Sequence, residues 1–162
     1  MTGSTHFITG SAIGKLSGNP ILATILGFLF HFVMDMVPHW DYGYHFKKRT
    51  ISFIIAALEP FLGVMVVLWI VINRDFSQTA IINTLIGGVF CVLPDAMSVF
   101  IKFFKIKPLS FFLKIHKKCH WFIKVPDSPF EWQEIKTTPW GVFWGIFWQI
   151  PFIVIPMIIL MR

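Results

Sequence analysis

Several histidine and aspartate side chains of this chain are spaced as the ligands of a divalent metal ion would be. In the stretch HFVMDMVPHWD, His31 and Asp35 lie one helical turn apart and therefore share a helix face. Pro38 ends such a helix, so that His39 and Asp41 can fold back over its end. Imidazole and carboxylate ligands together suit zinc, manganese or iron, and the sequence alone does not select one of these metals.

A second histidine pair follows in a lysine-rich stretch. His116 and His120 lie at positions i and i+4 of a predicted helix, a spacing that suits two imidazoles on one ion. On a helical wheel they fall with apolar residues such as Leu113, whereas Lys114 and Lys118 fall on the opposite side. This pattern predicts an amphipathic helix at a membrane interface, with its lysines toward lipid headgroups and its histidines toward the protein.

Three further ionisable residues, His6, Glu59 and Asp95, lie within apolar segments, where charged groups are rare and mark functional sites. A carboxylate removed from water is unstable unless it is protonated or paired with a cation, and one divalent ion would satisfy several such groups at once. Glu59 is the candidate general base, because burial raises the pKa of a carboxyl group. The predicted metal ligands are His31, Asp35, His116, His120, His6 and Asp41, and the predicted catalytic groups are Glu59 and Asp95, with Asp95 a further candidate ligand.

The composition indicates that membrane-spanning helices position these residues. Of the 162 residues, 56% are hydrophobic and only 14% are charged, and the mean hydropathy is +0.71. A soluble globular chain is about 45–50% apolar and about 25% charged. These values argue against a soluble enzyme and a disordered chain, and two cysteines without a CxxC motif argue against a disulfide scaffold. We predict a single integral membrane domain over residues 1–162.

Five apolar segments can supply the helices, and all but the first approach or exceed the roughly 20 residues that cross a bilayer. They run over about residues 4–17, 19–37, 51–72, 79–101 and 140–161. Asn19 and Pro20 are the predicted N-cap and first helical residue of the second segment, and Pro151 and Pro156 predict kinks in the last. The expected fold is an all-α bundle with four or five spans and an interfacial amphipathic helix.

Positive charge gathers in two of the loops between these segments. Residues 47–49 are all basic, and eight lysines lie between Lys102 and Lys136. Because two spans separate these loops, they lie on the same side, which the positive-inside rule makes the cytoplasm. We therefore expect a multi-pass protein of the inner cell membrane, whose basic connection over about residues 102–138 meets anionic lipid headgroups rather than nucleic acid. In this orientation the ionisable residues of the spans fall in the cytoplasmic leaflet.

Small residues accompany the ionisable groups on their helix faces. Gly27 shares the face of His31 and Asp35, and Gly63 shares that of Glu59. Small residues are typical of surfaces where membrane helices pack closely, so the ionisable groups should face other helices rather than lipid. Several such faces turned inward would gather the histidines and carboxylates into one cluster.

These motifs also resemble those of a known family. The matching residues are Thr5-His6, the stretch HFVMDMVPHWD, Leu93-Pro94-Asp95, and the pair His116 and His120. Together they are similar to the LexA-regulated family of membrane-bound metal-dependent hydrolases, small proteins of the bacterial inner membrane. The similarity extends over most of the chain, and HxxxDxxPHxD is its most specific part. Two family patterns are incomplete here: Pro-Asp-x-Asp ends after its first aspartate, and HRxxTHS is reduced to two spaced histidines.

The resemblance implies a metal-dependent hydrolase, and the depth of the cluster favours a lipid phosphoester as substrate. Two other functions stay open on the sequence. The first is a non-catalytic membrane protein with a structural metal or an interhelical polar network. The second is a transporter or proton relay, which would require ionisable residues through the full membrane depth, whereas the far leaflet has almost none.

Overall fold

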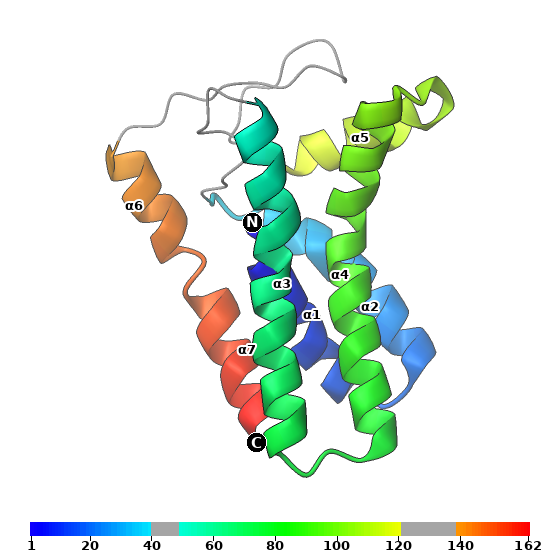
Figure 1. Ribbon diagram of the computed structural model, residues 1–162, viewed down its shortest axis with the longest axis vertical. Coiled ribbons are helices and arrows are strands. Elements are labelled where there is room, and N and C mark those ends of the chain that lie inside the picture. The colour runs from blue at the N-terminus through cyan, green and yellow to red at the C-terminus, as the bar shows by residue number, and fades with distance from the viewer. Residues whose placement is uncertain (40–48, 121–138) are drawn as a thin grey trace.

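The computed structural model describes residues 1–39, 49–120 and 139–162, and this part of the chain contains helices and no strand (Figure 1). The elements are α1 (Gly3–Leu16), α2 (Pro20–Asp35), α3 (Arg49–Asn73), α4 (Gln78–Phe104), the 3-10 turn η2 (Lys107–Leu109), α5 (Ser110–Cys119), α6 (Pro139–Phe147) and α7 (Pro151–Met161). The predicted all-α class is thereby confirmed. Each predicted apolar segment corresponds to one helix, except the last, which forms the pair α6 and α7.

Local signals in the sequence account for several helix ends. The side chain of Asn19 accepts a hydrogen bond from the Leu22 amide and caps α2, whose first residue is Pro20, as predicted. The predicted kink at Pro151 is confirmed as a break between α6 and α7, whereas Pro156 lies inside α7. The end of α2 at Asp35 follows from the extended backbone required before Pro38.

The central helix of the bundle is α1. It packs against α2, α3, α4 and α7, and its residues from Thr5 to Ala12 are all buried. Its 14 residues extend over about 21 Å, less than the thickness of a hydrocarbon core at about 30 Å. Because the other helices surround it, the first apolar segment can contain threonine, serine and glycine although the rest of the chain is strongly apolar.

Glycines allow α1, α2 and α4 to approach closely. Gly10 and Gly14 of α1 and Gly27 of α2 lie against the backbone around Gly87 of α4, and a Cβ atom at any of these positions would collide with the facing backbone. Close contact between small residues is how helices associate where the surroundings are as apolar as the side chains. The prediction that small residues face other helices is confirmed here.

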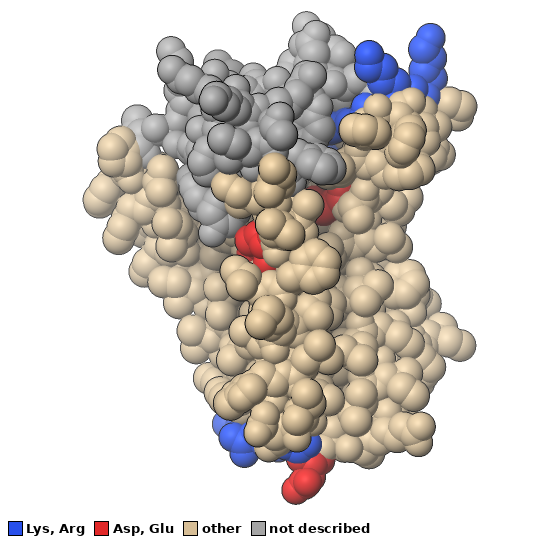
Figure 2. All heavy atoms as spheres, in the orientation of Figure 1, with Lys and Arg blue, Asp and Glu red and all other residues tan. Residues whose placement is uncertain are grey.

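Two helical stretches are long and apolar enough to cross a membrane, namely Gln78–Phe104 and Pro139–Met161. Pro20–Asp35 and Ala57–Asn73 are apolar but shorter. Large apolar side chains such as Leu62 of α3 are exposed, and on the face viewed in Figure 2 the surface between the acidic groups of the upper half and the charged residues at the lower end shows no lysine, arginine, aspartate or glutamate. The predicted number of spans, four or five, stays a prediction.

The helix α5 is amphipathic, as predicted. Leu113 and His116 are buried on one side, whereas Lys114 and Lys118 are exposed on the other. It packs against α4 and α2, and Figure 1 shows it crossing the end of the bundle where α1 begins and α2 ends. Its histidine face is therefore turned toward the protein.

Candidate metal centre

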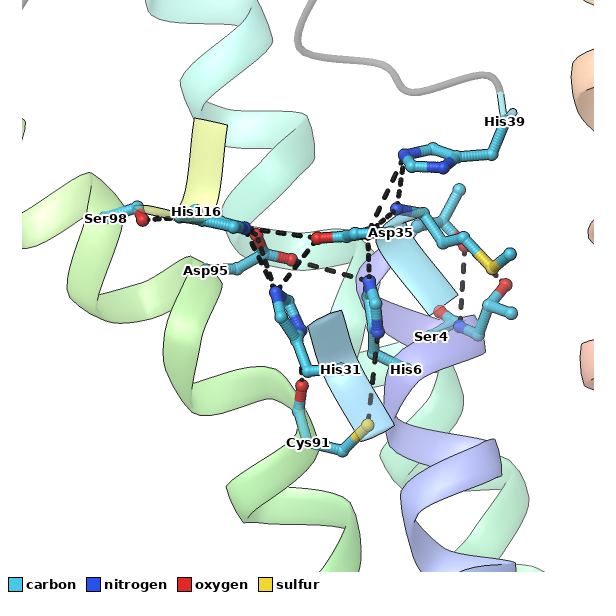
Figure 3. Close-up of polar contacts among 12 residues, drawn as sticks. Ser4, His6, His31, Asp35, His39, Cys91, Asp95, Ser98 and His116 are labelled. Atoms are coloured by element: carbon cyan, nitrogen blue, oxygen red, sulfur yellow. Dashed lines mark hydrogen bonds and ion pairs between the residues drawn. The ribbon is translucent and has the colours of Figure 1, made fainter. Parts of the chain in front are cut away.

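A single carboxylate, that of Asp35 at the end of α2, lies at the centre of a group of histidines (Figure 3). His6 places Nε2 3.1 Å from Oδ1 of Asp35. His31, His116 and His120 place their Nε2 atoms 3.0, 3.1 and 3.2 Å from Oδ2. None of these side chains is more than 10% exposed. These five residues, with His39 and Asp95, are called the Asp35 cluster below.

The glycine contacts between helices bring two of these histidines together. His6 lies one turn before Gly10 on α1, and His31 lies one turn after Gly27 on α2. Because both glycines contact α4 closely, the two imidazoles meet beyond them and stack with ring centroids 4.2 Å apart. The same face of α2 then places Asp35 one turn beyond His31. The predicted helix faces thus account for three of the seven residues of the cluster.

The helices α4 and α5 complete the cluster. Oδ1 of Asp95 on α4 lies 3.4 Å from Nε2 of His116 and 3.8 Å from Nε2 of His31. Ser98, one turn along α4, lies 2.5 Å from Nδ1 of His116 and holds that ring in place. The Asp95 side chain is 36% exposed, whereas that of Asp35 is fully buried. Asp95 is therefore the most accessible group of the cluster.

Hydrogen bonds at Nδ1 of two histidines determine which ring nitrogen carries the lone pair that faces the cluster. Nδ1 of His31 lies 2.8 Å from the carbonyl oxygen of Cys91, and Nδ1 of His39 lies 2.7 Å from that of Val37. Because a carbonyl only accepts, Nδ1 is the donor in both rings, and Nε2 of the neutral ring keeps its lone pair. The His31 lone pair then faces a carboxylate oxygen of Asp35. Two such acceptors in contact require a positive charge, either a proton on the ring or a metal ion.

The distances between these atoms fit a single tetrahedral ion. Ligand atoms about 2.1 Å from zinc lie about 3.4 Å from one another in a tetrahedron. Among Nε2 of His31, Oδ2 of Asp35, Oδ1 of Asp95 and Nε2 of His116, five of the six separations are 3.0, 3.1, 3.1, 3.4 and 3.8 Å. These four groups could hold one metal ion, and a second group that could do so consists of Asp35, His39 and His120.

The structure brings most of the predicted site residues together. His31, Asp35, His116 and His120, all predicted ligands, belong to these two groups, as does Asp95. His6, also a predicted ligand, contacts Asp35 but belongs to neither group. Asp41 lies outside the described residues.

Glu59, the predicted general base, has a different environment. Its carboxylate accepts hydrogen bonds from the Ser4 amide at 3.0 and 3.1 Å, and the Ser4 hydroxyl donates to the Glu59 carbonyl at 2.7 Å. The carboxylate thus satisfies an amide in the first turn of α1, where negative charge is favourable. Among the described residues it is not part of a group that could share a metal ion. Its role as a base stays a prediction.

One residue of the cluster, His39, and one group in contact with it, the Met1 nitrogen, were not among the predicted ligands. His39 is buried and folds back over the end of α2, as expected after Pro38. Its spacing of four residues from Asp35 was the signal that could have identified it. The Met1 nitrogen lies 2.6 Å from Oδ1 of Asp35 and 2.5 Å from Nε2 of His39, and the sequence offers no comparable signal for it. Burial, together with the positive charge at Met1, lowers the pKa of His39 to about 2.

Comparison with known proteins does not extend these observations. No protein-family model, curated protein or solved structure matches the chain. The resemblance to the family of membrane-bound hydrolases therefore stays a prediction. The buried group of histidines and aspartates that could hold a metal ion is the feature from which a function can be inferred.

Proposed function

We propose that this chain is a membrane-bound, metal-dependent hydrolase that acts on a lipid phosphoester. Its ion would be held by His31, Asp35, Asp95 and His116. The observation that carries this proposal is the meeting of imidazole lone pairs and carboxylate oxygens at the spacing of a tetrahedral site. A divalent ion bound there would polarise a phosphoryl oxygen and acidify a water molecule.

The surroundings of the ligands support a preorganised site. The Cys91 carbonyl fixes the ring of His31, and Ser98 fixes that of His116. Outer hydrogen bonds of this kind orient metal-binding imidazoles and raise their basicity. Asp95, the partly exposed ligand, marks the side from which substrate and water would enter. The other three ligands are thus buried, and the carboxylate of Asp95 is the accessible one.

A lipid substrate is supported by where the cluster lies. Two described helices are long and apolar enough to cross a membrane. The helix that supplies His116 also exposes Lys114 and Lys118, which would attract the phosphate of a lipid headgroup. Asp35 ends α2, and α5, which carries these lysines, crosses the same end of the bundle (Figure 1). We therefore propose that the substrate approaches with its headgroup at this end, in the cytoplasmic leaflet of the inner membrane.

A structural metal site is the alternative, and one observation favours it. The four groups His31, Asp35, Asp95 and His116 would fill all positions of a tetrahedral ion, whereas catalytic zinc sites keep one position open. In that case the ion would hold α2, α4 and α5 together without turnover. The two functions share the same ligands and differ in whether a substrate can replace one of them.

Metal analysis of the detergent-purified protein tests the shared part of both functions. The parent protein should retain a divalent ion after dialysis, and His31→Ala and Asp35→Asn should lose it, because each removes a ligand from the same site. Asp75→Asn is the matched control, because Asp75 lies beside Lys15 and Arg74, outside the Asp35 cluster. Absence of metal from the parent, or equal retention by all variants, would refute the proposed site.

A turnover assay separates the enzyme from the structural site. Phospholipids in mixed micelles are incubated with the metal-loaded protein, and released phosphate or headgroup is measured by mass spectrometry. We expect release that stops with chelator and in Asp95→Asn, while Asp75→Asn remains active. A loaded, folded protein that releases nothing from the phospholipid classes tested would favour the structural function.

A further inference from the structure

We infer that the Asp35 cluster holds two divalent ions and that Asp35 is shared between them. The first ion would be bound by His31, Asp95 and His116, and the second by His39 and His120. This inference rests on the proposed metal site and adds a second ion to it. It assigns a ligand role to His39.

The first observation is that the two groups able to hold a metal have only Asp35 in common. His39 follows α2 and His120 follows α5, whereas Asp95 of the first group lies on α4. Both imidazoles are buried, with 7% and 8% of their surface exposed. A carboxylate has two oxygens and about four lone-pair sites, which allows it to bind two cations at once.

The second observation is that the cluster offers more ligand atoms than one ion can bind. A tetrahedral ion takes four ligands, and the first group already supplies four. His120 places Nε2 3.2 Å from Oδ2 of Asp35, in addition to the two histidines of that group. His39 approaches the other oxygen, Oδ1. The imidazoles therefore surround both oxygens of a single carboxylate.

The third observation is the distance between His39 and Asp35. Nε2 of His39 lies 3.8 Å from Oδ1 of Asp35, which is too far for a hydrogen bond but within the separation of two ligands on one ion, at most about 4.2 Å for bonds of about 2.1 Å. The Met1 nitrogen contacts both of these atoms. This nitrogen is a positively charged ammonium group that pairs with Asp35, so a cationic group lies between the two ligand atoms, and the second ion would replace it there.

The chemical consequence concerns the class of substrate. Paired ions about 3.5–4 Å apart are typical of phosphatases and nucleases, where they stabilise the attacking and the leaving oxygen of an in-line displacement. A shared carboxylate would hold such a pair in a fixed relation. Two ions at Asp35 would therefore strengthen the assignment to phosphoester hydrolysis over a structural site.

Manganese stoichiometry provides the test. The detergent-purified protein is stripped with chelator and loaded with Mn²⁺. Bound metal per chain is then measured by mass spectrometry, and low-temperature electron paramagnetic resonance shows whether the ions are coupled. We expect two ions per chain with an exchange-coupled signal. The variant His39→Ala/His120→Ala should bind one ion and show an uncoupled signal, and Asp75→Asn should retain two coupled ions.

The outcomes distinguish this inference from the proposed function on which it rests. One ion per chain in the parent would refute the second ion and leave the single site intact, whereas no ion would refute both. Two coupled ions in His39→Ala/His120→Ala would place the second ion elsewhere and refute its assignment. If the double variant does not fold, His120→Ala alone serves, because His120 lies at the end of α5, and it should lower the affinity for the second ion at least tenfold.

Discussion

The two ends of the described bundle use ionisable residues in opposite ways. At the end where α2 stops, the Asp35 cluster is built from groups of several helices, buried except for Asp95, and each contacts another ionisable group. At the other end, Lys15, Arg74, Asp75 and Arg162 border a pocket. Lys15 donates to the carbonyls of Ile159 and Leu160 and contacts the ring of Phe76.

The partners of the charged groups distinguish a candidate binding site from a helix cap. Lys15 satisfies carbonyl groups in the last turn of α7, a position where positive charge is favourable. The Asp35 cluster instead gathers several imidazoles around two carboxylates, and in the contacts described the Met1 ammonium, 2.6 Å from Oδ1 of Asp35, is the cationic group that pairs with it. Hydrogen-bond acceptors that are buried in contact with one another are unstable unless protons or metal ions lie between them. The four predictions that follow test this contrast.

The largest effect is expected for Asp35→Ala. The substitution leaves several imidazoles buried without their shared partner, and breaking one side of a buried charged network costs about 3–5 kcal/mol of the free energy of unfolding. Metal retention should be lost at the same time. Thermal unfolding in detergent and metal analysis measure the two effects, with Asp75→Ala as the control. Equal losses of thermal stability and of bound metal in Asp35→Ala and Asp75→Ala would show that the two ends of the bundle do not differ in this way.

The second largest effect is expected for Gly87→Val, which tests the contact that brings the helices together. The added side chain would collide with Gly10 and Gly14 of α1, and overpacking of this kind costs about 1–3 kcal/mol. Metal affinity should fall as well, because His6 and His31 would move apart. Gly18, which has open space around its Cβ position but a φ of +75°, is changed to Asn as the control. Unchanged metal binding in Gly87→Val would show that the cluster does not depend on this contact.

A smaller effect is expected for Ser98→Ala. The hydroxyl contacts Nδ1 of His116, and loss of such an outer hydrogen bond weakens metal binding about 10–100-fold. Isothermal titration with zinc measures the change, and Ser77→Ala provides a control serine that caps α4 at the opposite end. Equal affinities for the parent and both variants would refute an orienting role for Ser98.

The smallest effect is expected for Lys15→Met, which removes the charge at the other end of the molecule. Cations near a helix C-terminus contribute about 0.3–1 kcal/mol, so the midpoint of thermal unfolding should fall slightly. Metal retention should not change, because Lys15 contacts α7 and Phe76 rather than the cluster. A loss of metal in this variant would mean that the two ends are coupled.

The sequence was sufficient to predict the part of the cluster that depends on helix periodicity. His31 and Asp35 share a face at a spacing of four residues, and the small residues around them indicate that this face meets other helices. His6 follows the same logic on α1. These predictions succeeded because a regular helix fixes the direction of each side chain relative to its neighbours.

The remaining part depends on turns and contacts that carry no clear sequence signal. Lys105 ends α4 with a φ of 51° and redirects the chain toward α5. Glycine or asparagine is the usual residue in this left-handed conformation, so a lysine there does not predict the turn. Glu59 was expected in the cluster from its depth and face, but a free amide of Ser4 on α1 binds its carboxylate instead. Competition between such partners is decided by tertiary packing.

X-ray absorption spectroscopy of the zinc-loaded protein tests most directly whether histidines and aspartates from separate helices bind the ion. We predict nitrogen and oxygen neighbours at about 2.0–2.1 Å, with the outer-shell scattering of at least two imidazole rings, and loss of this scattering in His31→Ala/His116→Ala. A zinc ion surrounded by oxygen alone, with no imidazole scattering in the parent protein, would contradict the proposed centre.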